Sequence, residues 1–134
     1  MSVILCLDPG VAHTGIAISY EGILSQPLAT IFERDIDTLV GKITPFIVRL
    51  NPDVIVVGQP PHGPLRQHAQ ALSEKIMKIF SGDILLFDEE ISSKEARSIM
   101  RANKKNISSQ KTDEHQTAAA VILRTFLEEH QELS

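Results

Sequence analysis

Two apolar segments in the middle of the chain constrain the fold more than any other feature. Val54 to Val57 is a run of four β-branched residues without polar alternation, and Ile84 to Phe87 is a second short apolar run. Strands of this kind are buried on both faces, which requires helices above and below a mainly parallel sheet. Between them, Leu65 to Phe80 carries apolar residues at helical spacing. A strand, helix, strand unit is therefore predicted.

The rest of the pattern predicts an antiparallel meander before this unit and two helices after it. The expected strands are Val3–Leu7, Gly15–Tyr20 and Ile23–Ile31, followed by a helix over Asp35–Leu50 that ends at Asn51-Pro52, and the later helices are Ser92–Asn103 and Thr112–Glu129. The order βββαβαβαα predicts an α/β fold with a mixed five-stranded sheet flanked by helices. With 134 residues and 43% apolar composition, one domain over residues 1–134 is expected.

Cysteine content and hydropathy exclude several classes of protein. Cys6 is the single cysteine, so no internal disulfide and no cysteine-based metal cluster can form. The first apolar run stops at Asp8, too early for a signal peptide, and no stretch approaches the roughly 20 apolar residues of a membrane span. We expect a cytoplasmic protein with no membrane partner.

Charge is distributed unevenly along the chain. The net charge is −4, and the first 65 residues hold three basic and six acidic residues, whereas residues 94–111 hold six basic residues and one acid. A basic flank beside an acidic body predicts a surface that contacts nucleic-acid phosphates, although a solvated helix face has the same composition. The candidate phosphate-contacting residues are Arg97, Arg101, Lys104, Lys105 and Lys111.

A carboxylate and three glycines mark the expected ends of two strands. Asp8 ends the first strand and is followed by Gly10 and Gly15, while Gly58 ends the Val54 strand. Sites in such sheets form at the carboxyl ends of parallel strands, and glycines let a phosphate or metal approach the backbone. Asp8 is thus placed like a metal ligand. The alternatives are an aspartate that caps a turn, or the similar opening of an actin-like ATPase, which needs a second domain to enclose nucleotide.

Two further acidic residues follow the Ile84 strand. Because successive side chains of a strand point to opposite faces, only one of Asp88 and Glu89 is expected to face Asp8. An acidic turn that stabilises the start of the next helix is the alternative.

The start of the last helix supplies the third candidate position. His115 shares a helical stripe with the apolar residues Ala118, Ala119, Ile122 and Phe126, which predicts that it points toward the strand ends. Asp113 is about 200° away around the same helix, and it also fits a helix N-cap. A hydrogen-bonded buried histidine is the alternative for His115.

Four segments in order resemble the YqgF/RuvX family, RNase H-like proteins described as Holliday junction resolvases or pre-16S rRNA nucleases. The resemblance covers nearly the whole chain. It rests on Asp8-Pro9-Gly10 through Gly15-Ile16-Ala17, on Val54 to Gly58 with Pro60 and Gly63, on Asp88-Glu89 with Ser92-Ser93 and Glu95-Ala96, and on Ala118 to Leu123.

The resemblance implies an RNase H-like fold and a nuclease that hydrolyses phosphodiester bonds with Mg²⁺ or Mn²⁺. Carried over by position, Asp8 and Glu89 are catalytic metal ligands, and the third ligand is His115 or Asp113. The implied partner is a DNA junction, which would favour a homodimer, or precursor rRNA, which a monomer could process.

This chain also departs from the family pattern. Glu90 stands where the family has arginine, Ala12 and His13 replace basic residues, and a gap-free alignment puts His115 at the position of the helix aspartate, with Asp113 two residues early. Histidine can ligate Mn²⁺. The alternative function is therefore a nucleic-acid-binding or regulatory protein with a decayed metal site.

Overall fold

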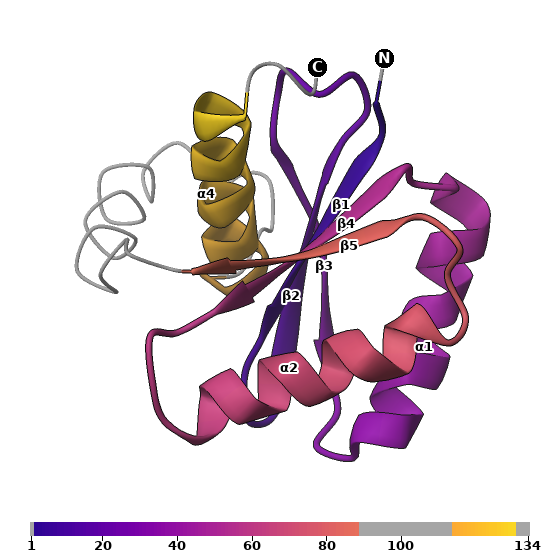
Figure 1. Cartoon of the computed structure of the whole chain (residues 1–134), viewed down its shortest axis with the longest axis vertical. Coiled ribbons are helices and arrows are strands. Elements are labelled where there is room, and N and C mark those ends of the chain that lie inside the picture. The colour runs from indigo at the N-terminus through magenta and orange to yellow at the C-terminus, as the bar shows by residue number, and fades with distance from the viewer. Residues whose placement is uncertain (1, 89–113, 131–134) are drawn as a thin grey trace.

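The computed structural model describes residues 2–88 and 114–130, and a mixed five-stranded sheet lies at their centre (Figure 1). Its strands are β1 (Ile4–Pro9), β2 (His13–Ser19), β3 (Gln26–Phe32), β4 (Val54–Gln59) and β5 (Asp83–Asp88), in the spatial order β3-β2-β1-β4-β5. The first three strands form an antiparallel meander, and β4 and β5 run parallel to β1. This is the predicted α/β architecture.

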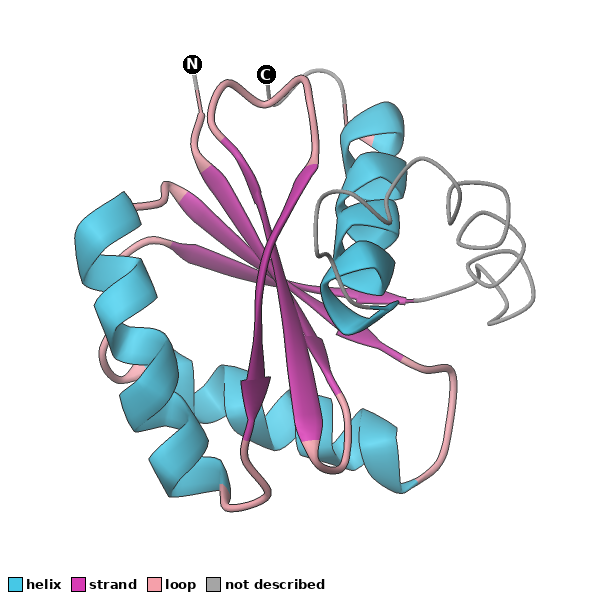
Figure 2. Cartoon of the chain, turned by 180° about the vertical axis from the view of Figure 1, so that it is seen from behind, coloured by secondary structure: helices cyan, strands magenta, loops and turns pink. Residues whose placement is uncertain are grey.

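Helices cover the sheet on both sides. The helices α1 (Ile36–Leu50) and α2 (Pro64–Met77) pack on one face, and α4 (Glu114–Glu129) packs on the other (Figure 2). Within residues 2–88 and 114–130, no helix combines the length and the apolar character needed to cross a bilayer.

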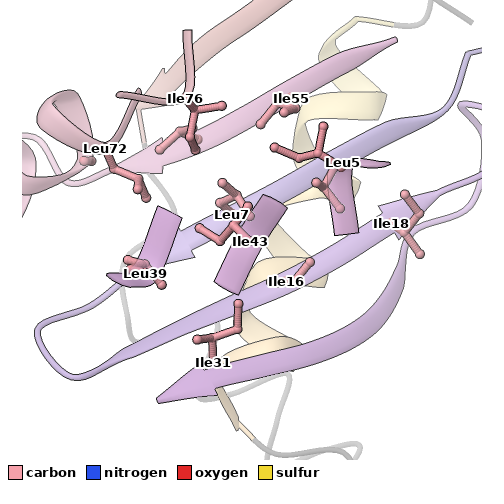
Figure 3. Packing of buried hydrophobic residues seen from close by; sticks show 13 residues of the cluster. Leu5, Leu7, Ile16, Ile18, Ile31, Leu39, Ile43, Ile55, Leu72 and Ile76 are labelled. Atoms are coloured by element: carbon pink, nitrogen blue, oxygen red, sulfur yellow. The ribbon is translucent and has the colours of Figure 1, made fainter. Parts of the chain in front are cut away.

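Side chains of the central strands alternate between two hydrophobic cores. Leu5 and Leu7 of β1 point to the core beneath α1 and α2, together with Ile43 and Leu72 from those helices (Figure 3). The alternate residues of β1 and β4 point to the core beneath α4. This alternation fixes the face on which each later strand residue lies.

Most predicted elements are confirmed, with shifts at their ends. The helix predicted over Asp35–Leu50 begins one residue later because Asp35 is its N-cap and accepts a hydrogen bond from the Thr38 N–H at 2.9 Å. Asn51 ends it with a φ of 46°. The predicted helix Ser92–Asn103 and the first two residues of Thr112–Glu129 lie outside the described residues.

Two boundaries were wrong by three residues. The third strand begins at Gln26 rather than Ile23, and Ile23 is 67% exposed in the preceding loop. The second helix ends at Met77 rather than Phe80, because the chain turns there and returns Phe80 to the core, where its ring lies over Gly82. Apolar residues just outside a strand or helix look, in the sequence, like part of that strand or helix, which is why both boundaries were misplaced.

The expectation that β5 is buried on both faces was also wrong. Leu85 and Leu86 are 36% and 42% exposed although they lie on opposite faces. The cause is topological, since β5 is an edge strand and the helices lie mainly over the strands further in. The prediction for β4 is confirmed, because four residues from Ile55 to Gly58 are buried between its two neighbours.

Candidate active site

Asp8 lies at the carboxyl end of β1 on the α4 side of the sheet. Ile4 and Cys6 belong to the core beneath α4, so strand alternation directs Asp8 to that same face. The residue is half-buried, and its neighbour across the antiparallel pair with β2 is Gly15. A carboxylate at this place borders both the core and the rim of the sheet.

Gly15 brings the first turn of α4 against this part of the sheet. A Cβ atom at Gly15 would collide with the backbone carbonyl of His115 and would lie 3.1 Å from the backbone nitrogen of Gln116. Only glycine allows a helix backbone to approach a strand so closely. The sequence predicts that Gly15 leaves room for a phosphate or metal, whereas in the structure the first turn of α4 occupies that space. The start of α4 therefore lies beside the residue that pairs with Asp8.

The imidazole of His115 lies against a second histidine from β2. Its ring is stacked on that of His13, with centroids 4.2 Å apart and planes 10° from parallel, and 33% of its side chain is exposed. His115 Nε2 also lies 3.7 Å from a carboxylate oxygen of Glu114. The ring therefore occupies the strand-end rim that the helical stripe predicted.

Phe32 completes this group of rings and was missed by the sequence reasoning. Its ring contacts His13 edge to face, with centroids 5.1 Å apart, because the two residues are direct partners in the pairing of β2 with β3. His13 was noted only as a departure from a basic family position. An aromatic residue at the end of a strand was the available signal.

The other two glycines shape the same rim. The Gly10 N–H donates a 2.7 Å hydrogen bond to the carbonyl of His13, which closes the turn between β1 and β2. A Cβ at Gly10 would lie 2.8 Å from that carbonyl oxygen, so the turn requires glycine. Gly58 is buried in β4 and pairs with Phe87 of β5.

Asp88 points to the opposite face of the sheet from Asp8. One of its oxygens accepts hydrogen bonds from Arg66 Nη1 and from Gln59 Nε2, both at 2.9 Å, and Arg66 also donates to the carbonyl of Pro60 at 3.1 Å. The hydrogen bonds from Arg66 and, second, from Gln59 lower the pKa of Asp88. Its carboxylate is thus engaged beneath α2.

The described residues contain only part of the predicted site. The residues that the structure brings to one edge of the sheet are Asp8, Gly10, Gly15, Gly58 and His115. Glu89, Asp113 and the basic cluster of Arg97, Arg101, Lys104, Lys105 and Lys111 lie outside the described residues. Among residues 2–88 and 114–130, no three His, Cys, Asp or Glu side chains form a group that could hold a metal. The two ligand candidates that the structure describes would need partners from the remaining part of the chain.

The ion pair of Asp88 predicts a specific dependence of stability on pH. Because the folded-state pKa of Asp88 is lowered, the pair stabilises the fold above a pH of about 4, and this contribution is lost as the pH falls through the lowered pKa. Asp88→Asn should reduce the urea midpoint of unfolding at pH 7 and should reduce it progressively less as the pH is lowered below 4. Asp83→Asn, at the exposed start of the same strand, is the control. Equal effects of Asp88→Asn at pH 7 and at pH values below 4 would contradict this role.

Comparison with solved structures identifies the fold class. The chain superimposes on Thermus thermophilus RuvC in complex with a Holliday junction substrate with a TM-score of 0.64 at 13% identity, over 96% of both chains. The fowlpox virus Holliday junction resolvase gives a TM-score of 0.62 at 14% identity, over 95% of this chain and 99% of the other. The fold is that of the RuvC-like, RNase H-fold resolvases.

Sequence comparison identifies the family within that class. A protein of Bacillus cereus (strain B4264) named "Putative pre-16S rRNA nuclease" is 31% identical over 133 residues, which cover 93% of this chain and 97% of the relative. A protein of Bacillus cytotoxicus with the same name is 29% identical, again over 93% of this chain and 97% of the relative. The model of the RuvX family, described as Holliday junction resolvase, matches residues 2–129. The chain belongs to the RuvX family, and the family resemblance is confirmed.

Proposed function

We propose that this chain is a divalent-metal-dependent nuclease that hydrolyses phosphodiester bonds at the edge of the sheet where Asp8 lies. The observation that carries the proposal is the position of the Asp8 carboxylate, at the end of β1 and beside the first turn of α4. Membership of the RuvX family and the names of its relatives as nuclease or resolvase support the reaction class.

The donor atoms at this edge suit Mg²⁺ or Mn²⁺. Asp8 supplies carboxylate oxygen, which both ions accept, and His115 supplies a partly exposed imidazole nitrogen. Since Asp88 is engaged by Arg66, we assign the second carboxylate to Glu89, which follows Asp88 in sequence and is the position that matches the family. Asp8, Glu89 and either His115 or Asp113 would hold the ion, which would supply an activated water and stabilisation of the leaving oxygen.

The chain's own residues would bind and orient the phosphodiester. Gly10 and Gly58 carry no side chain that could block the backbone of a nucleic acid from reaching Asp8. We assign phosphate contacts on the flank of the site to the basic cluster Arg97, Arg101, Lys104, Lys105 and Lys111. A soluble single domain in the cytoplasm, monomeric or homodimeric, fits this function.

Removal of the basic cluster should change the salt dependence of binding. A variant with Arg97, Arg101 and Lys104 all replaced by alanine should bind nucleic acid more weakly. The magnitude of the slope of log affinity against log salt should fall by roughly 2 to 3 units if each residue neutralises one phosphate. Filter binding between 50 and 300 mM KCl measures the slope. An unchanged slope would assign these residues to solubility.

Variants of His115 distinguish the two candidates for the third ligand. His115→Ala should lower the cleavage rate by about two orders of magnitude, and His115→Asp should shift the preference from Mn²⁺ toward Mg²⁺, which accepts nitrogen poorly. Initial rates with each ion measure both effects. If His115→Ala cleaves at the parental rate and Asp113→Asn is inactive, the ligand is Asp113.

The proposed substrate is a DNA four-way junction or precursor 16S rRNA, as the names of the relatives suggest. The test incubates purified protein with each labelled substrate in Mg²⁺, Mn²⁺ or EDTA. We expect cleavage of one substrate that requires a divalent ion. Tight binding without cleavage under either metal would favour the alternative, a binding protein with a decayed site, which the engagement of His115 by His13 also fits.

A further inference from the structure

Three aromatic rings from three elements meet at the end of the sheet where Asp8 lies. His13 of β2 is stacked on His115 of α4 at 4.2 Å and contacts Phe32 of β3 edge to face at 5.1 Å. We refer to His13, Phe32 and His115 as the aromatic cluster. Of these three residues, only His115 is a candidate metal ligand, so the proposed metal site gives no role to His13 and Phe32.

The outer ring of the aromatic cluster is open to solvent. Phe32 is 62% exposed, although the preceding residue, Ile31, is only 8% exposed and belongs to the core. Val11, in the adjoining β1–β2 turn, is 63% exposed. Single exposed apolar residues are common, but Phe32 contacts the His13 imidazole, which is itself stacked on His115 at the candidate active site. The result is an accessible aromatic surface at the rim of the sheet.

Strand register places this aromatic surface close to Asp8. Gly15 pairs with Asp8, and His13 lies two residues along β2 from Gly15, on the same face. Two strand residues span about 7 Å and neighbouring strands lie about 5 Å apart, so the aromatic cluster is roughly 8–12 Å from Asp8. A nucleic-acid strand with a phosphate at Asp8 would bring a base one or two nucleotides away to the cluster.

We propose that the aromatic cluster is a stacking subsite for an unpaired nucleobase of the substrate. This inference rests on the proposed nuclease function and specifies its substrate, a strand with at least one base out of the helical stack beside the cleaved bond. A base within a duplex has both faces covered by its neighbours, whereas a splayed base presents a face to an aromatic ring. Stacking accepts any base in RNA or DNA, so the subsite selects unpaired structure rather than sequence.

The test measures binding in an Asp8→Asn background, so that cleavage does not intervene. Fluorescence anisotropy is recorded with a single-stranded RNA, a single-stranded DNA and a fully paired duplex of the same sequence. Phe32→Ala should weaken binding to the single strands by about 5- to 100-fold and to the duplex by less than about twofold. The RNA and DNA arms show which strand the subsite prefers. Phe32→Trp should retain the parental affinity.

Two controls separate stacking from a structural effect. Tyr20→Ala removes another exposed aromatic, 48% exposed at the opposite edge of the sheet, and should leave all affinities unchanged. The slope of affinity against salt should be the same in Phe32→Ala and parent, because no phosphate contact is removed. Thermal unfolding checks that Phe32→Ala is folded.

Several outcomes would overturn the subsite. These are parental single-strand affinity in folded Phe32→Ala, an equal loss on duplex and single strands, an equal loss in Tyr20→Ala, or a parent that does not bind single strands. If Phe32→Trp and Phe32→Ala lose affinity alike, stacking is also excluded. Selective loss in Phe32→Ala would support the subsite even if the wild-type chain cleaved nothing, so failure of the nuclease proposal is distinguishable from failure of this one.

Discussion

Replacing Asp8 by asparagine should reduce the cleavage rate about a thousandfold or more while the protein stays folded. The change keeps the shape of the side chain but removes the negative charge that would hold a divalent cation, and several kcal/mol of transition-state stabilisation correspond to about three decades in rate. Because Asp8 is half-buried at the rim rather than in the core, the thermal midpoint should change little. Single-turnover cleavage at saturating Mg²⁺ or Mn²⁺ measures the effect.

A matched control for this variant is Glu21→Gln. Glu21 is an exposed carboxylate in the loop between β2 and β3, at the opposite edge of the sheet. The Glu21→Gln protein should therefore cleave at the parental rate. Parental activity of Asp8→Asn would remove Asp8 from the catalytic site. Equal loss in both variants would indicate a nonspecific effect of charge.

The second large effect should come from Gly15→Ala, through stability. The added methyl group would collide with the carbonyl of His115, and that carbonyl is helix backbone that cannot rotate away. Overpacking costs about 1–3 kcal/mol, and a collision with backbone lies at the upper end of that range, which for a domain of this size lowers the thermal midpoint by about 10 °C. Relief of the collision would also move the first turn of α4 away from Asp8, so cleavage should fall even well below the unfolding temperature.

Gly41→Ala provides the contrasting case. Gly41 lies in α1, no atom lies within 4 Å of an added Cβ, and alanine is a better helix former by about 0.5–1 kcal/mol. This variant should be slightly more stable than the parent and equally active. Differential scanning calorimetry of both variants gives the comparison. A Gly15→Ala protein as stable as Gly41→Ala would show that α4 does not dock closely on β2.

Much of the fold could be predicted because local patterns and tertiary structure agree. The run from Val54 to Val57 has no polar alternation because β4 lies between two strands and beneath helices on both sides. The helix after Asp35 was predicted closely because its N-cap and its end at Asn51 are local features of the backbone. The prediction of burial failed for β5, because its residues are as apolar as those of a central strand although it lies at the edge of the sheet.

The site was predictable in its position but not in its contacts. The end of β1, the Gly10 turn and the inward stripe of α4 are visible as strand ends, glycines and helical spacing. The stack of His13 on His115 joins residues about a hundred positions apart, and its geometry follows from the packing of α4 on β2. Likewise, nothing local shows that Arg66 engages Asp88. Such pairs follow from tertiary packing, which residue spacing does not encode.

Direct measurement of metal binding tests the central claim that Asp8 holds a divalent cation. Mn²⁺ is titrated into the parent, Asp8→Asn and Glu21→Gln proteins, and free Mn²⁺ is followed by electron paramagnetic resonance. We expect saturable binding by the parent and by Glu21→Gln, and affinity weaker by about tenfold or more in Asp8→Asn, since one anionic ligand is lost. Equal Mn²⁺ affinity in the parent and Asp8→Asn proteins would contradict this claim.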